Sequence, residues 1–85
     1  MKNLQVTIIT PESVQEQFEA DSLVVPLEDG YWGILPKHSN MVATLVKGKV
    51  KARTKGGEKV YEIPEGWIQV FHNRIIILTP SFALI

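Results

Sequence analysis

The sequence contains no cysteine and only two histidines among its 85 residues. The lack of thiols excludes disulfide bonds, thiolate metal sites and cysteine nucleophiles. A zinc site needs three or four ligands, whereas His38 and His72 stand far apart in the sequence without a metal-binding spacing. We therefore expect no metal site, and we expect each histidine to hydrogen-bond locally within a loop.

Long apolar runs and targeting signals are also missing. The longest aliphatic run, residues 75–78, is far too short to span a bilayer. The start of the chain leads into an alternating pattern rather than into the continuous apolar stretch of a signal peptide. Because no linker-like tract divides the chain, we expect one small soluble cytoplasmic domain that covers residues 1–85.

The formal net charge is zero, but acidic residues dominate residues 1–46 and basic residues dominate the rest. Five basic residues recur at every second position, which would place them on one face of one strand, where a nucleic-acid backbone could bind. A solvated strand face that blocks edge pairing is the favoured interpretation, because no aromatic residue shares that face to stack bases. These residues are Lys47, Lys49, Lys51, Arg53 and Lys55.

Alternating segments and frequent turns indicate an all-β fold. Leu4, Val6 and Ile8 recur at period two, which is the pattern of a half-buried strand, and Thr10-Pro11 ends that strand. Turn signals return about every eight to twelve residues, and no segment has the pattern of a convincing helix. The sequence therefore predicts a small antiparallel β-sandwich or flattened barrel.

Two hairpins have registers that can be read from their turns. A two-residue Gly56-Gly57 loop and a His72-Asn73 turn each fix which residues lie opposite one another. The reverse face of the second hairpin is too apolar for a freely solvated surface, so we expect a second sheet or a partner to cover it. The predicted pairs are Val50 with Ile63, Ala52 with Tyr61, Lys51 with Glu62, Val70 with Ile75, and Ile68 with Ile77. The reverse face carries Trp67, Gln69, Phe71, Ile76 and Leu78.

No group of residues forms a convincing catalytic or cofactor site. His38 and Ser39 are adjacent, so on an extended chain their side chains point to opposite sides and the imidazole could not activate the serine. The nearest carboxylate pair, Glu28 and Asp29, stands beside a glycine, where aspartate usually serves the turn itself. No glycine loop has the pattern of a phosphate site. We therefore expect a protein that is not an enzyme.

The segment around Asp29-Gly30 is the most informative part of the chain. This dipeptide predicts a hairpin turn, and Pro36 should end the second strand because proline cannot donate to a sheet ladder. Tyr31 and Trp32 follow the turn, and because adjacent strand residues face opposite ways, at least one of them should point outward. Large aromatic residues are enriched in interaction hot spots.

Several short motifs occur in a fixed order along the whole chain. They are Ile9-Thr10-Pro11-Glu12, Glu19-Ala20-Asp21, Val25-Pro26, Asp29-Gly30, Gly33-Ile34-Leu35-Pro36 with His38, Leu45 with Gly48-Lys49-Val50, and Gly66 before Asn73. In this order and spacing they resemble the amino-terminal domain of the ATP synthase epsilon subunit, which is called delta in mitochondria.

The resemblance implies a β-sandwich of about ten strands in the central stalk, or rotor, of a rotary ATP synthase. It implies docking on the gamma subunit and on the membrane ring of c subunits, so that proton or sodium transport is coupled to ATP synthesis. No catalytic residue and no cofactor are implied, because nucleotides turn over in the alpha and beta subunits. The implied location is peripheral, on the cytoplasmic face of the inner membrane or its organellar equivalent. No nucleic-acid partner is implied.

The resemblance also implies two contact regions. Tyr31 departs from the family, which commonly has a glutamate there, so we expect the ring contact to be aromatic rather than ionic. Residues 37–40 replace the usual Gly-His-Ala-Pro and keep only its histidine, and the sequence stops at Ile85, before the usual carboxy-terminal helical hairpin. The implied ring contacts are Asp29, Gly30, Tyr31 and Trp32, and the implied gamma contacts are His38, Ser39, Asn40, Met41, Trp67 and Phe71.

An alternative hypothesis comes from a different functional class. In it the chain is a free-standing β-sandwich adaptor or nucleic-acid-binding domain that uses the basic segment from Lys47 to Lys55. Salt dependence separates the two hypotheses, since phosphate binding falls steeply with salt whereas docking on an apolar surface barely changes.

Overall fold

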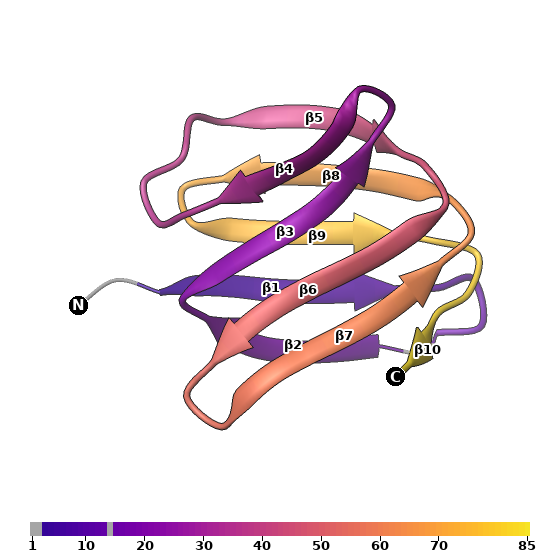
Figure 1. Ribbon diagram of the computed structural model, residues 1–85, viewed down its shortest axis with the longest axis horizontal. Helices are drawn as coiled ribbons and strands as arrows, with labels where there is room; N and C mark the ends of the chain where they lie inside the picture. The colour runs from indigo at the N-terminus through magenta and orange to yellow at the C-terminus, as the bar shows by residue number, and fades with distance from the viewer. Residues whose placement is uncertain (1–2, 14) are drawn as a thin grey trace.

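A computed structural model gives the fold of residues 3–13 and 15–85. Two five-stranded sheets pack face to face as a β-sandwich (Figure 1). These residues form ten strands and no helix, so the prediction of an all-β sandwich of about ten strands is confirmed; no helix in this part of the chain is long and apolar enough to cross a membrane. The strands are β1 (Leu4–Ile9), β2 (Gln15–Ala20), β3 (Ser22–Leu27), β4 (Gly30–Ile34), β5 (Met41–Leu45), β6 (Gly48–Thr54), β7 (Gly57–Ile63), β8 (Gly66–Phe71), β9 (Arg74–Leu78) and β10 (Ala83–Leu84).

The first sheet has the strand order β2-β1-β9-β8-β5, and the second has the order β10-β7-β6-β3-β4. Neighbouring strands are antiparallel, except that β1 and β9 are parallel. This parallel pair departs from the purely antiparallel sandwich that the sequence predicts. β1 and β9 are separated in the chain by β2 to β8, which belong to both sheets, and such a long connection leaves no local turn signal.

The inward-facing side chains of both sheets form one hydrophobic core. The predicted period-two pattern of β1 is confirmed, because Leu4, Val6 and Ile8 are buried. A fully buried aliphatic side chain contributes about 1.5–3 kcal/mol, so a core of this kind is the main source of stability. The buried hydrophobic residues are Leu4, Val6, Ile8, Ala20, Leu23, Val25, Leu27, Ile34, Leu45, Val50, Ala52, Tyr61, Ile63, Ile68, Val70, Ile75 and Ile77.

Tyr61 links the two sheets at the side where β2 and β7 approach. Its ring stacks on Phe18 at a centroid distance of 5.9 Å and meets the edge of Phe82 at 5.5 Å. Its hydroxyl donates a hydrogen bond of 2.8 Å to Glu16 Oε1. Burial, and after it this hydrogen bond, raise the pKa of the Tyr61 phenol above its ordinary value. Tyr61 is therefore a neutral donor that ties β7 to the edge strand of the other sheet.

The two predicted registers have different outcomes. The register of β8 and β9 is confirmed, since Val70 lies opposite Ile75 and Ile68 opposite Ile77. The register around Gly56-Gly57 is wrong by two residues, because the turn residues are Lys55 and Gly56 and Gly57 already lies opposite Thr54. The observed pairs are Ala52 with Lys59, Val50 with Tyr61, Gly48 with Ile63, and Lys51 with Val60.

Gly57 explains why this turn lies one residue earlier. Its φ of 121° is in a region that favours glycine, so Gly57 serves as the first paired residue after the turn. Thr54 supports this arrangement by donating from Oγ1 to the Gly57 carbonyl at 2.6 Å. Gly30 has the same role after the Glu28-Asp29 turn, with a φ of 124° and Leu27 opposite it. A shift of two residues keeps every side chain on its face, so the predicted core residues stay inside.

Candidate interaction surfaces

Large apolar side chains cover part of the outer face of the first sheet. Their exposed fractions range from 36% for Ile76 to 69% for Val42. Of the two covers predicted for this face, the second sheet is excluded, because it packs on the inner face of the same strand, where Ile68 and Val70 lie, and a partner is the alternative that stays a prediction. We call this surface the outer patch, and it consists of Val42, Trp67, Phe71, Ile76 and Leu78.

The strand registers make the outer patch continuous. Trp67 of β8 lies opposite Leu78 of β9, and Gln69 lies between Val42 of β5 and Ile76 of β9. All of these positions share one face of the sheet because side chains alternate along each strand. An exposed apolar cluster that spans three strands is typical of a protein–protein contact surface.

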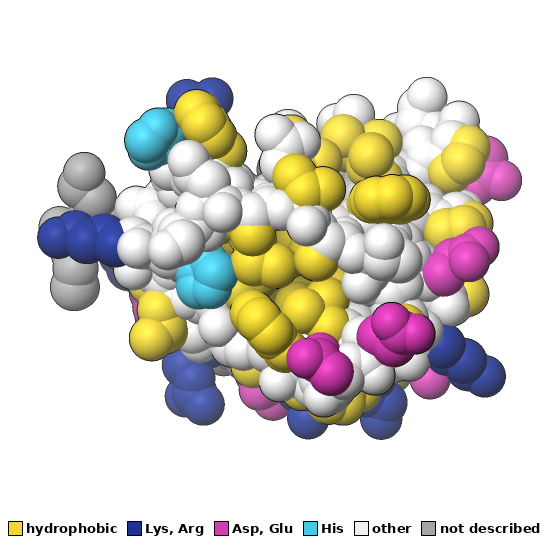
Figure 2. Space-filling model, turned by 90° about the horizontal axis from the view of Figure 1, so that it is seen from above, with side chains coloured by type: hydrophobic (Ala, Val, Ile, Leu, Met, Phe, Trp, Pro, Cys, Tyr) yellow, Lys and Arg dark blue, Asp and Glu magenta, His cyan; other side chains and the backbone are white. Residues whose placement is uncertain are grey.

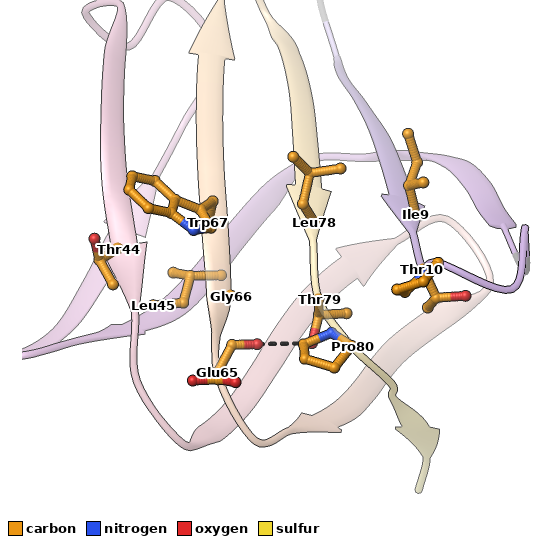
Figure 3. A pocket seen from close by; sticks show the side chains of 11 residues that line it. Ile9, Thr10, Thr44, Leu45, Glu65, Gly66, Trp67, Leu78, Thr79 and Pro80 are labelled. Carbon is orange, nitrogen blue, oxygen red and sulfur yellow. Dashed lines mark hydrogen bonds between the residues drawn. The ribbon is translucent and has the colours of Figure 1, made fainter.

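A hollow of about 510 Å³ opens beside the outer patch, at the ends of β1, β5, β8 and β9 (Figure 3). Trp67 and Leu78 form one side of it, and the Thr79 hydroxyl lies 2.7 Å from the Glu65 carbonyl at the other side. Gly66 allows the close approach of β8 and β9, because a Cβ at this position would lie only 2.5 Å from the Leu78 carbonyl oxygen. Because its lining is mostly apolar, this hollow suits an apolar side chain of a partner protein better than a polar ligand.

The turn at residues 28–32 presents two aromatic side chains. Tyr31 is 58% exposed and Trp32 is 44% exposed, so the prediction that at least one points outward is confirmed. The Trp32 indole N–H donates to Asp29 Oδ1 at 3.2 Å, which folds the ring back toward the turn. The Tyr31 hydroxyl accepts a long hydrogen bond of 3.4 Å from the Lys49 N–H. A Cβ at Gly48 would lie 3.0 Å from this hydroxyl, so a larger residue at position 48 would crowd the Tyr31 side chain.

The loop that carries His38 is held against the β8–β9 turn. Asn73 Oδ1 accepts from the Lys37 N–H at 2.6 Å, and Asn40 Oδ1 accepts from the His72 N–H at 3.2 Å. His38 Nδ1 lies 2.7 Å from the carbonyl oxygen of the neighbouring Ser39, as expected for a histidine that bonds within its own loop. These contacts bring His38, Ser39 and Asn40 close to Phe71, whose ring centroid lies 4.2 Å from that of His72.

The predicted contact residues thus do not form one continuous site. The turn that begins at Asp29 and the loop that carries His38 lie at the two ends of β4 (Figure 1). Trp67 and Phe71 share one face of β8, about 13 Å apart at the rise of a strand. Met41 is half-buried and packs against the core, so only part of its side chain is available for contact with a partner.

The basic segment is less continuous than predicted. Only Lys49, Lys51 and Arg53 face outward from β6, whereas Lys47 precedes the strand and Lys55 lies in the following turn. The predicted Lys51–Glu62 pair is wrong as a result of the register shift. Glutamates lie opposite the two flanking cations, with Glu62 opposite Lys49 and Glu58 opposite Arg53. An aromatic residue, Tyr31, does reach this face beside Lys49, but the glutamates offset the charge that a phosphate backbone would need.

Ionisable groups show no arrangement for catalysis in the part of the chain that the structure describes. Hydrogen bonds from Gln5 and Asn3 lower the pKa of the exposed Glu19 carboxyl. Within residues 3–13 and 15–85, no group of three His, Cys, Asp or Glu residues could hold a metal ion. The described side chains contain no buried polar atom without a hydrogen-bond partner. The geometry therefore indicates surfaces for docking rather than a reaction centre.

Comparisons with known proteins agree with this fold. The family profile described as "ATP synthase, Delta/Epsilon chain, beta-sandwich domain" matches residues 3–84. An ATP synthase epsilon chain of Leptospira interrogans is 41% identical over 81 residues, which cover 95% of this chain and 64% of that protein. The epsilon chain of Symbiobacterium thermophilum is 39% identical over 85 residues, which cover 99% and 61%. The chain thus spans less than two thirds of the length of these relatives.

Two solved structures have the same fold. One is a chain of the Euglena gracilis mitochondrial ATP synthase in an OSCP/F1/c-ring assembly, with a TM-score of 0.87, 21% identity, and coverage of 96% of this chain and 53% of that one. The other belongs to the central stalk and c-ring of the Tetrahymena thermophila mitochondrial ATP synthase, with a TM-score of 0.75, 19% identity, and coverage of 96% and 66%. At these identities the likeness establishes the fold alone.

Proposed function

The chain belongs to the family of ATP synthase delta/epsilon chain β-sandwich domains, and from this membership we propose that it is a non-catalytic rotor subunit of a rotary ATP synthase. In this role it docks the gamma subunit onto the c ring and helps to couple proton or sodium transport to ATP synthesis in the alpha and beta subunits. Its location is then peripheral, at the cytoplasmic face of the membrane or the organellar equivalent, through the complex.

The outer patch is the observation that carries this proposal within the structure. Half-exposed Trp67 and Phe71 lie on the same face as Ile76 and Leu78, and nothing in the described chain covers them. Removing such an apolar surface from water is favourable by about 25 cal/mol per Å², so the complex with a permanent partner gains stability when the partner covers it. Gamma is the proposed partner, with the neighbouring loop of His38, Ser39 and Asn40 at the rim of the contact.

The ring contact is proposed for the turn between β3 and β4. Tyr31 and Trp32 are half-exposed there, and Asp29 is fixed by its bond to the Trp32 indole. A subunit that joins two partners needs separate contact regions, and this turn belongs to the second sheet whereas the outer patch lies on the outer face of the first. Because both exposed side chains are aromatic, this contact depends on packing and hydrogen bonding more than on charge.

Co-purification at moderate salt with a reconstituted gamma subunit and c ring tests the proposal. We expect the chain to be retained on the complex, and Trp67→Ser to weaken retention by roughly tenfold or more, as for a hot-spot aromatic residue. Lys51→Ala is the matched control, since Lys51 lies on the outer face of the other sheet, and its retention should equal that of the parent. Equal retention of all three proteins, or no retention of the parent, would contradict the proposal.

A further inference from the structure

One side of the sandwich ends in two edge strands, each paired on one side only. β4 is an edge of the second sheet and β5 is an edge of the first, and both lie at the top of the molecule in Figure 1. Hydrophobic side chains gather on this side when it is viewed directly (Figure 2). A hollow of about 660 Å³ lies at one end of it, between the β3–β4 turn and β5.

The interior of the sandwich is only partly closed along this side. Trp32 is on the same face of β4 as Ile34, which is fully buried, yet Trp32 itself remains 44% exposed. Met41 and Ala43 of β5 pack against the core and are also only partly buried. The three side chains therefore form an apolar strip between the two strand edges.

The free edge of β4 carries backbone groups that point away from the sheet. The Pro26 carbonyl accepts a hydrogen bond from the Val46 N–H at 3.1 Å, so it points away from β4. Tyr31 lies opposite Pro26. In an antiparallel pair of this kind the two residues direct their backbone polar groups away from each other, so the N–H and C=O of Tyr31 point away from β3. Tyr31, and Gly33 two residues later, thus present their backbone groups at the free edge.

The side chains of β4 do not protect this edge. Natural sheets usually block an exposed edge with lysine, proline or a bulge. The residues of β4 are Gly30, Tyr31, Trp32, Gly33 and Ile34, and the first four are exposed. A Cβ placed on Gly33 would have no atom within 4 Å, so the outer face above this glycine is open.

We propose that the β4 edge binds an extended segment of a partner protein, which adds to the second sheet as an antiparallel strand. A strand is the ligand that can pair with the N–H and C=O groups of both Tyr31 and Gly33. Its residue opposite Trp32 points into the apolar strip and is apolar, and its residue opposite Gly33 fills the open space and is large. The segment ends beside Glu28 and Asp29, so its last residue is basic.

A six-residue peptide provides the probe. It consists of threonine, valine, phenylalanine, valine, threonine and arginine in that order, with blocked ends, so that phenylalanine pairs with Gly33 and arginine reaches the turn. Its binding to the whole chain is followed by the NMR shifts and the hydrogen-exchange rates of the backbone amides. The matched control peptide has methylated backbone nitrogens at the phenylalanine and the second threonine, which removes the donors to Gly33 and Tyr31.

We expect saturable shifts centred on β4, slower exchange of the Tyr31 and Gly33 amides, and binding at least about tenfold weaker for the methylated peptide. Gly33→Pro, which removes one donor, should weaken binding by a similar factor, whereas Lys51→Ala should not change it. Equal binding of the two peptides, or protection confined to another edge, would overturn the proposal. Slow exchange of these amides that depends on protein concentration without peptide would also overturn it, because a second copy would then occupy the edge.

The outcome does not depend on the proposed role in an ATP synthase. A chain that fails to join gamma and the c ring could still bind the peptide, and a chain that assembles could still leave β4 unoccupied. A negative result in one experiment therefore does not imply a negative result in the other.

Discussion

Replacement of Gly66 by alanine should destabilise the domain through one backbone contact. The new Cβ would lie 2.5 Å from the Leu78 carbonyl oxygen and 3.4 Å from the Thr79 Cβ. Gly66 is not among the glycines with positive φ, so the cost comes from this contact rather than from the backbone conformation. The carbonyl belongs to a strand of the core and cannot rotate away, so β8 and β9 must separate locally. Overpacking of this kind costs about 1–3 kcal/mol.

Thermal unfolding measures this cost directly. In a domain of this size each kcal/mol lowers Tm by about 4–8 °C, so Gly66→Ala should lower Tm by roughly 4–24 °C. Gly56→Ala is the matched control, because the nearest atom to its new Cβ is the Thr54 hydroxyl oxygen at 4.0 Å and its φ is not positive. The steric argument is refuted if the two variants melt within about 2 °C of each other.

Further predictions concern Tyr61 and the aromatic residues of the β3–β4 turn. Tyr61→Phe removes the hydrogen bond to Glu16 and should cost about 1 kcal/mol in urea unfolding. The pKa of Tyr61 is raised in the folded state, so the contribution of the neutral phenol to the free energy of unfolding is present below pH 10 and is lost as the pH rises further. Above pH 10 the parent should therefore lose more stability than Tyr61→Phe. Equal losses of the two proteins would contradict this. Tyr31→Ala and Trp32→Ala should each weaken retention on the c ring by about 1–2 kcal/mol, at low and high salt alike. Retention like that of the parent would show that this turn is not the ring contact.

The faces of the strands could be predicted from the sequence, but one register could not. Period two alone assigns Val50 and Ala52 to the core, and an error of two residues leaves that assignment intact. The position of the turn depends on which glycine takes the positive φ. Gly56 and Gly57 are equivalent in the sequence, and the hydrogen bond from Thr54 that favours the observed turn is visible only in the structure.

Long-range pairing also lay beyond the sequence patterns. Nothing near β1 indicates that it lies parallel to β9, and nothing near Glu16 indicates that its partner is Tyr61, 45 residues away. The exposure of the outer patch is a further example. Its residues are as apolar as the core residues beside them, so composition predicted that something covers them without showing that the second sheet packs against the other face.

The end of the molecule that carries His38 combines unusual backbone conformations with specific hydrogen bonds. Lys37, His72 and Asn73 have φ values of 70°, 50° and 66°, a region that residues other than glycine rarely occupy. Such conformations cost of order 1–3 kcal/mol each and persist where the surroundings hold them. Here the side chains of Asn40 and Asn73 bond to the backbone of the opposite loop and hold both loops in place. A partner that docks on this end meets a surface already ordered, so little conformational entropy is lost on binding.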